Sequence, residues 1–171
     1  MYVNGDPTPQ PDGHASSAWT VPLLEPAQLF QAISGRFTGA LPLAGWAREL
    51  SDLHAELRFQ LDHARQSACD SEHVRAGIEN IVGEIDRWAA RNVPVSTSAR
   101  KHTHSLGEVI SHIAKIYADA WWMVLHSTDA ERRHQAWFHL GEAREGYAEL
   151  VNEIRARHLR LPLGTTGFRC V

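Results

Sequence analysis

Histidine, aspartate, arginine and tyrosine side chains stand on the apolar faces of several segments of this sequence. His54 lies between Leu50 and Leu57, and Arg58 follows one turn later at the edge of the same face. At about 100° per residue, His54 falls within about 20° of the centre of that face. Burying a polar group costs free energy unless it is hydrogen-bonded or paired, so such positions are where interior chemistry is expected.

Three further segments contribute polar groups in the same way. Asp86 flanks an apolar face, and His102 projects to the apolar side of its own segment if a helix has begun there. Arg144 and Tyr147 lie on the last long segment, whose inner face is expected to include Trp137. The pattern predicts that these groups meet in the interior of the protein.

The predicted interior site would carry out acid–base chemistry. An imidazole beside a carboxylate in a low-dielectric interior has a perturbed proton affinity, which is the usual mark of a general acid or base. His54 and His102 are the expected catalytic acid and base, with Asp86 orienting one imidazole. The expected substrate-binding groups are Arg58, Arg144, Tyr147 and Trp137. The alternative is that each is a separate core residue with its own partner.

The 11 histidines also raise the question of a metal. His104, Glu108 and His112 are four residues apart and share one helix face, but other polar residues lie beside them, which favours a solvated face. Glu131 and His134 have the spacing of one half of a di-iron site, and such a site needs two halves. These are weak candidates, no Cys/His cluster has zinc spacing, and no cofactor is expected.

Composition excludes several classes of protein. The 171 residues carry a net charge of −3, which argues against a nucleic-acid binder. No apolar run approaches the roughly 20 residues of a membrane span. Residues 1–20 lack the basic start and apolar core of a secretory signal, and the two cysteines form no C-x-x-C pair. We therefore expect a cytoplasmic protein with a small-molecule ligand and no nucleic-acid or membrane partner.

The elements that must position these residues are helical. Residues 1–22 and 163–171 are expected to be flexible tails around one domain at 23–162. Helices are expected at about Glu25–Ser34, Pro42–Ala68, Ser71–Asn92, Ser98–His126 and from Ser127–Asp129 to His158. Short links place neighbouring helices antiparallel. The expected fold is all-α: an antiparallel four-helix bundle of long helices with an extra short N-terminal helix.

Two adjacent tryptophans bear on the oligomeric state. Trp121 falls on the apolar face of its helix and is expected in the core. Trp122 falls on the outer side, where an exposed large apolar group marks a dimer contact or a pocket rim. A homodimer is therefore a further expectation.

Several short motifs occur in a fixed order between Leu23 and Pro162. They are Leu41-Pro42-Leu43, Leu53-His54 with Arg58, Ile85-Asp86-Arg87-Trp88, the run from His102 to Ile110, Ala136-Trp137 with Leu140, Gly146-Tyr147 with Leu150-Val151, and Arg160-Leu161-Pro162. In order and spacing, this set resembles a bacterial family of helical proteins, the domain of unknown function family 4254. The resemblance implies an all-helical bundle with His54, Asp86, His102 and Tyr147 at its site, and it implies no particular reaction.

The sequence departs from this family at two places. The family has Glu where this chain has His104, and Asp-Arg where it has Ser111-His112. If those acidic groups are functional in the family, the chemistry of this chain is altered or lost.

Three functions follow as hypotheses. The first is a small-molecule enzyme using the interior groups, in specialised metabolism. The second is a non-catalytic ligand-binding or dimeric interaction module, and the third is a metal-dependent helical-bundle oxidase or hydrolase.

Overall fold

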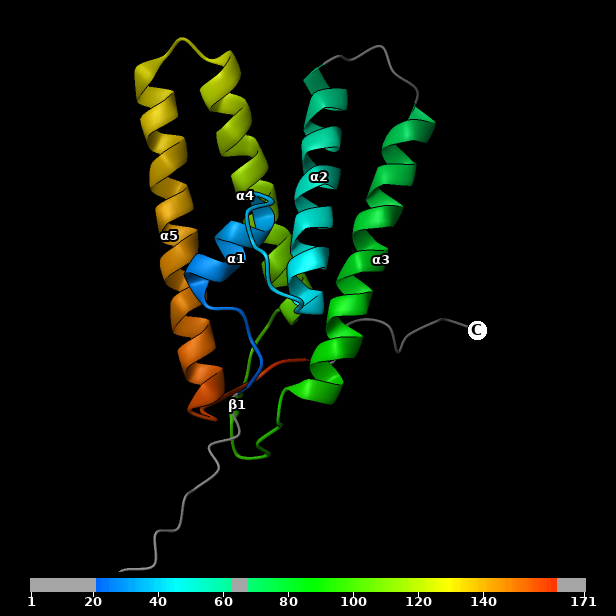
Figure 1. Cartoon of the computed structure of the whole chain (residues 1–171), viewed down its shortest axis with the longest axis vertical. Coiled ribbons are helices and arrows are strands. Elements are labelled where there is room, and N and C mark those ends of the chain that lie inside the picture. Colours follow the sequence, from blue (N-terminus) through cyan, green and yellow to red (C-terminus); the bar gives the residue numbers. More distant parts are fainter. Residues whose placement is uncertain (1–20, 63–67, 163–171) are drawn as a thin grey trace, which may run out of the picture.

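The protein is built almost entirely of helices, as a computed structural model that describes residues 21–62 and 68–162 shows (Figure 1). The helices are α1 (Pro26–Ile33), α2 (Pro42–Asp62), α3 (Ala68–Asn92), α4 (Leu106–His126) and α5 (Ala130–Arg155). Two short strands, β1 (Arg100–Lys101) and β2 (Leu159–Arg160), pair in parallel. The expected all-α class is confirmed. Within the described ranges, every helix is too short or too polar to cross a bilayer.

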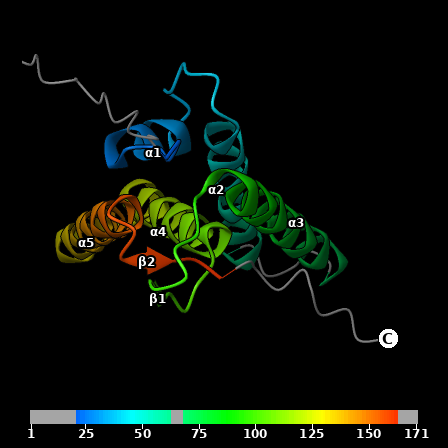
Figure 2. The same ribbon diagram turned by 90° about the horizontal axis from the view of Figure 1, so that it is seen from below.

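Helix α4 is the centre of the packing. It contacts α2, α3 and α5, and α2 also packs against α3. In Figure 1 the four long helices alternate in direction, and in Figure 2 α5 and α3 lie on opposite sides of α4. Helix α1 lies across α2 and α5, and α5 packs mainly on α4, α1 and β2. The antiparallel four-helix bundle stays a prediction, because α5 is not seen to close against α3.

The start of α4 corrects the sequence prediction. The helix begins at Leu106 and not near Ser98, because residues 100–101 are held extended by strand β2. Ser105 and Glu108 then form a reciprocal cap: the Ser105 hydroxyl accepts from the Glu108 N–H (3.2 Å), and the Glu108 carboxylate accepts from the Ser105 N–H (2.7 Å). This capping box sets the boundary.

Two other helix boundaries differ from the expected ones. Helix α3 already includes Ala68, where the preceding helix was expected to end, and its expected start was Ser71. No glycine or proline between these residues stops a helix. Helix α5 ends at Arg155 and not at His158, because Arg157 takes a left-handed backbone conformation (φ 59°). The predicted tails lie outside the described residues except for Val21, which is buried, and Pro22.

The core occupies the half of the molecule that α1 covers. Its largest fully buried side chains are Leu24, Leu29, Ile33, Leu43, Leu50, Ile85, Leu106, Ile110, Tyr147, Val151 and Ile154. At the opposite end, Leu61 of α2 is 59% exposed, although it was expected on the apolar face. The far ends of α2 and α4 therefore carry exposed apolar groups.

Candidate functional site

The polar groups expected to meet in the interior have separate partners. His54 Nε2 lies 2.9 Å from the Ser111 hydroxyl oxygen. The Tyr147 hydroxyl donates to the Leu24 carbonyl at 3.0 Å, which fixes the chain leading into α1. Asp86 accepts from a backbone N–H of α4. His54, Asp86 and Tyr147 are all at least half-buried, but none of these hydrogen bonds joins one of them to another, so a common site stays a prediction.

Asp86 joins α3 to the first turn of α4. One of its carboxylate oxygens accepts from the Gly107 N–H at 2.8 Å, and the Ser105 side chain is a second hydrogen-bond partner. Burial raises the pKa of Asp86, and the hydrogen bonds from Gly107 and Ser105 partly offset this. A Cβ on Gly107 would lie 2.4 Å from the Val82 carbonyl oxygen, so α3 and α4 meet there backbone to backbone. Asp86 thus anchors α4.

His54 is held neutral on the α2 side of α4. Burial, followed by the positive charge of Lys115, lowers the pKa of His54 to about 4. Its partner Ser111 is one of the polar residues beside His104, Glu108 and His112, for which a solvated face was expected, but Ser111 is buried.

Two expected site residues, Arg144 and Trp137, lie outside the interior, and a third, His102, is half-buried. His102 precedes α4, and its Nδ1 contacts the backbone of His104. Arg144 is exposed, and Trp137 is 47% exposed. The buried face of α5 follows Leu140 and Tyr147, and Ala136 and Ala143 continue it at spacings of four and three. This phase turns Trp137 and Arg144 outward, since each follows a face residue by one position, about 100° around the helix.

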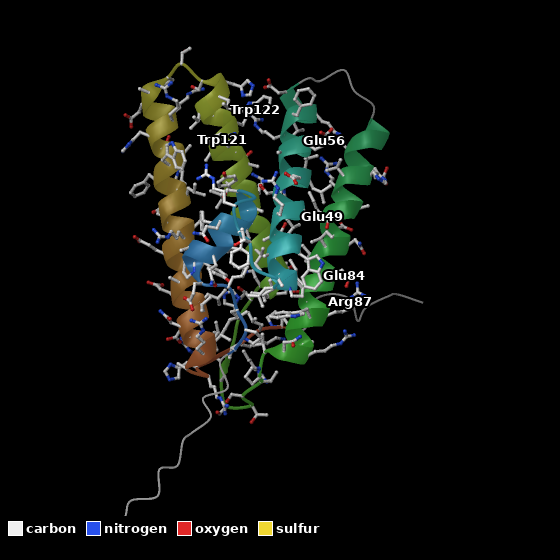
Figure 3. All side chains as sticks on the ribbon, viewed as in Figure 1. Glu49, Glu56, Glu84, Arg87, Trp121 and Trp122 are labelled. Atoms are coloured by element: carbon white, nitrogen blue, oxygen red, sulfur yellow. The ribbon has the colours of Figure 1, made fainter. Side chains whose placement is uncertain are left out.

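Arg58 of α2 lies beside Trp122, near the end of α4. Its guanidinium lies 5.5 Å from the centroid of the Trp122 ring and 3.9 Å, from Nε, to Asp119. Trp122 also stacks on His126 and is half-buried, whereas Trp121 is 46% exposed (Figure 3). The expected orientations of the two tryptophans are therefore reversed.

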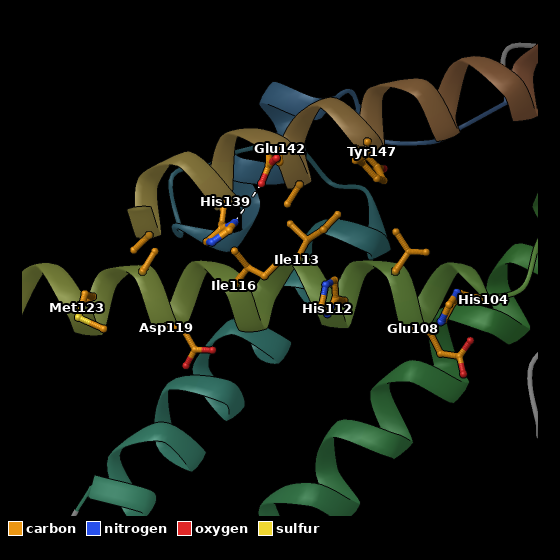
Figure 4. Close-up of a pocket in the computed structure, with 15 residues that line it drawn as sticks. His104, Glu108, His112, Ile113, Ile116, Asp119, Met123, His139, Glu142 and Tyr147 are labelled. Atoms are coloured by element: carbon orange, nitrogen blue, oxygen red, sulfur yellow. Dashed lines mark hydrogen bonds and ion pairs between the residues drawn. The ribbon is translucent and has the colours of Figure 1, made fainter. Parts of the chain in front are cut away.

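A groove between α4 and α5 is the feature that the sequence reasoning missed. The α4–α5 groove has a volume of about 730 Å³, and its apolar wall includes Ile113, Ile116, Ala120, Ala143 and Tyr147. Its polar lining residues are His104, Glu108, His112, Asp119, His139 and Glu142 (Figure 4). The three residues expected on a solvated face, His104, Glu108 and His112, thus border a cavity.

His139 and Glu142 form the one hydrogen-bonded imidazole–carboxylate pair among the lining residues of the groove. His139 Nδ1 lies 3.0 Å from a Glu142 carboxylate oxygen (Figure 4). Because an ionised carboxylate only accepts hydrogen bonds, Nδ1 carries the proton. In a neutral ring this leaves the lone pair on Nε2 for a bound molecule. The signals for this pair were its i, i+3 spacing and the small residues Ala136, Ala143 and Gly146 on the same helix.

Metal ligands are not assembled in the part of the chain that the structure describes. No group of three or more His, Cys, Asp or Glu side chains there is arranged to hold an ion. Glu108 also caps α4 with one carboxylate oxygen. The role expected for His104, Glu108 and His112 as ligands stays a prediction.

A second hollow, of about 550 Å³, lies between α2 and α4. Its lining includes Trp121 and two residues of each charge, Arg36, Arg48, Asp52 and Glu56. Arg48 and Asp52 are paired at 3.0 Å. Its charges are therefore balanced, unlike those of the α4–α5 groove.

Comparisons with protein-family models, with curated proteins and with solved structures find no match for this chain. The resemblance to family 4254 stays a prediction that rests on the motifs.

Proposed function

We propose that the protein binds a small molecule with an apolar body in the α4–α5 groove. The observation that carries the proposal is the cavity between the two helices, with its apolar wall and a few polar groups. Ligand sites in proteins are typically about 300–1,000 Å³ and have this composition. The 730 Å³ groove falls within that range.

A pair of glycines on α5 provides the test. Gly146 lines the groove, Gly141 does not, and a Cβ at either position would meet no atom within 4 Å. Gly146→Leu therefore adds an apolar side chain at the groove whose Cβ meets no clash, and Gly141→Leu is the matched control. With Nile red as a neutral apolar probe, we expect saturable binding that Gly146→Leu weakens about tenfold or more, through loss of apolar contact area.

The control should bind the dye as the wild type does. If Gly146→Leu binds the dye with unchanged affinity, the groove is not the site. If the Gly141→Leu variant loses binding equally, the effect lies in the fold of α5 and the proposal fails.

Acid–base catalysis on the bound molecule is the second candidate function. The His139–Glu142 pair supports it, because a carboxylate that orients an imidazole is a recurrent arrangement for a general base. In this second candidate function, His139 has the acid–base role that was expected from the sequence for His54 and His102. It extends the binding proposal and needs the same groove.

The test for catalysis compares His139→Asn with His134→Asn, an exposed histidine of the same helix that does not line the groove. Each protein is incubated with a bacterial metabolite extract, and the mixture is analysed by mass spectrometry. We expect one metabolite to be consumed by the wild type and by His134→Asn, but not by His139→Asn. Equal consumption by all three proteins would remove His139 from the mechanism.

Three finer expectations remain predictions. The alternating helix directions support an antiparallel four-helix bundle (Figure 1). Exposed Phe59, Trp121 and Leu125 support a homodimer, because large exposed apolar groups are frequent at interfaces. Light scattering on a size-exclusion column measures the oligomeric state directly. A cytoplasmic location is the third.

A further inference from the structure

The charges that line the α4–α5 groove are of one sign. Three carboxylates line it, those of Glu108, Asp119 and Glu142, and no lysine or arginine does. The remaining titratable side chains of the groove, apart from the Tyr147 phenol, are imidazoles. A bound anion would therefore face carboxylates without a cation among the lining residues, and this imbalance bears on which ligand the groove accepts.

The three carboxylates are not equally available. Asp119 is neutralised, because Lys115 Nζ lies 2.6 Å and Arg58 Nε 3.9 Å from its oxygens. Glu108 and Glu142 each use the Oε2 oxygen inside the protein, for the Ser105 N–H and for His139. In the described part of the chain, the Oε1 oxygen of both side chains has no hydrogen-bond partner.

Glu142 is the stronger acceptor of the two. Glu108 lies in the first turn of α4, where the partial positive charge of the helix N-terminus compensates its negative charge. Glu142 lies in the middle of α5, far from either helix end, so no charge of a helix terminus compensates it. A cation therefore interacts more favourably with the carboxylate of Glu142 than with that of Glu108 or Asp119.

We propose that the α4–α5 groove selects a protonated amine with an apolar body over an anion or a neutral molecule of the same shape. The ammonium group would donate to Oε1 of Glu142, and the apolar body would lie along Ile113, Ile116 and Ala143. Hydrogen bonds between two charged groups are about twice as strong as neutral ones. This inference rests on the proposed binding function and names the class of its ligand.

Three probes that share one apolar chain separate the contribution of the charged head group from that of the chain. We would titrate n-octylamine, 1-octanol and octanoate into the full chain by isothermal calorimetry at pH 7. The expected order of affinity is amine, then alcohol, then carboxylate, with the amine about tenfold or more above the carboxylate, as about 1.4 kcal/mol gives. Raising the salt concentration should narrow the difference, because the side chain of Glu142 is more than half exposed.

Glu142→Gln and Glu145→Gln are the matched variants. Glu145 is an exposed neighbour on α5 that does not line the groove. Glu142→Gln should lower the affinity for octylamine several-fold and leave that for octanol unchanged, while Glu145→Gln changes neither. Equal binding of octylamine and octanoate, or an unchanged amine affinity in Glu142→Gln, would overturn the amine preference.

Failure of the binding proposal itself looks different. If none of the three probes binds, or if all bind to Gly146→Leu as to the wild type, the groove is not a ligand site and both proposals fall. If octanol and octanoate bind as well as the amine but all three are weakened by Gly146→Leu, only the charge preference falls.

Discussion

The two long sides of α4 use small residues in opposite ways. Towards α3, the absence of a side chain at Gly107 lets the two helices come into close contact. The Asp86 carboxylate accepts a hydrogen bond from the Gly107 N–H there. Towards α5, Ala143 and Gly146 leave a groove, because nothing approaches within 4 Å of where a Gly146 side chain would begin. Gly107 therefore allows close packing of α4 on α3, whereas Gly146 leaves space between α4 and α5.

Adding one methyl group on each side, at Gly107 and at Gly146, should give the largest difference in stability between the two sides. Gly107→Ala places a Cβ against the Val82 carbonyl and the Asp86 carboxylate, which should destabilise the fold by about 3 kcal/mol or more. Gly146→Ala meets open space in a helix and should stabilise by about 0.5–1 kcal/mol. Urea unfolding measures both. Similar effects of the two substitutions would contradict the difference between the sides.

Removing the carboxylate tests what draws α4 towards α3. Asp86→Ala leaves the buried Gly107 N–H without its acceptor, and we expect a loss of about 1–3 kcal/mol in the free energy of unfolding. Asp86→Asn keeps an oxygen for that N–H and should lose less. If the alanine and asparagine variants unfold at the same urea concentration, the hydrogen bond is not what holds the two helices together.

The contact of α4 with α2 includes the polar pair His54 and Ser111, and the contribution of His54 to stability should depend on pH. The pKa of His54 in the folded protein is about 4 against 6.5 as the ordinary value, so between these values the unfolded chain binds more protons. This contribution to stability is complete above pH 6.5 and is lost as the pH falls towards 4. His54→Gln should remove that pH dependence in urea unfolding between pH 4 and 7. An NMR titration of the His54 ring with a midpoint near 6.5 would refute this assignment.

The sequence was sufficient for the helices and insufficient for the site. Periodic apolar residues placed both ends of α1, α3 and α5 to within about three residues, but the expected end of α2, Ala68, lies in α3. The start of α4 depended on residues 100–101 pairing with residues 159–160, a contact between distant parts of the chain that no local pattern reports. Helix propensity alone extends α4 too far for this reason.

The site was missed because the phase of α5 was set by its tryptophan. Placing Trp137 inside carried Arg144 inside with it, and turned Ala136 and Ala143 away from the core. Weighting the alanines equally with the aromatic residue selects the observed face, with Tyr147 buried and Trp137 outside. His54 and Asp86 were correctly expected away from solvent, but periodicity gives direction and not distance, so their separate partners could not be foreseen.

The strand pair has one more consequence for the space between α4 and α5. Arg100 N–H donates to the His158 carbonyl and His102 N–H to the Arg160 carbonyl, at 3.1 and 2.9 Å. Together with the turn at Ser127–Asp129, these bonds close residues 100–160 into a ring, so neither end of the hairpin can splay without breaking it. A molecule bound in the proposed α4–α5 site would then enter from the flank of the two helices.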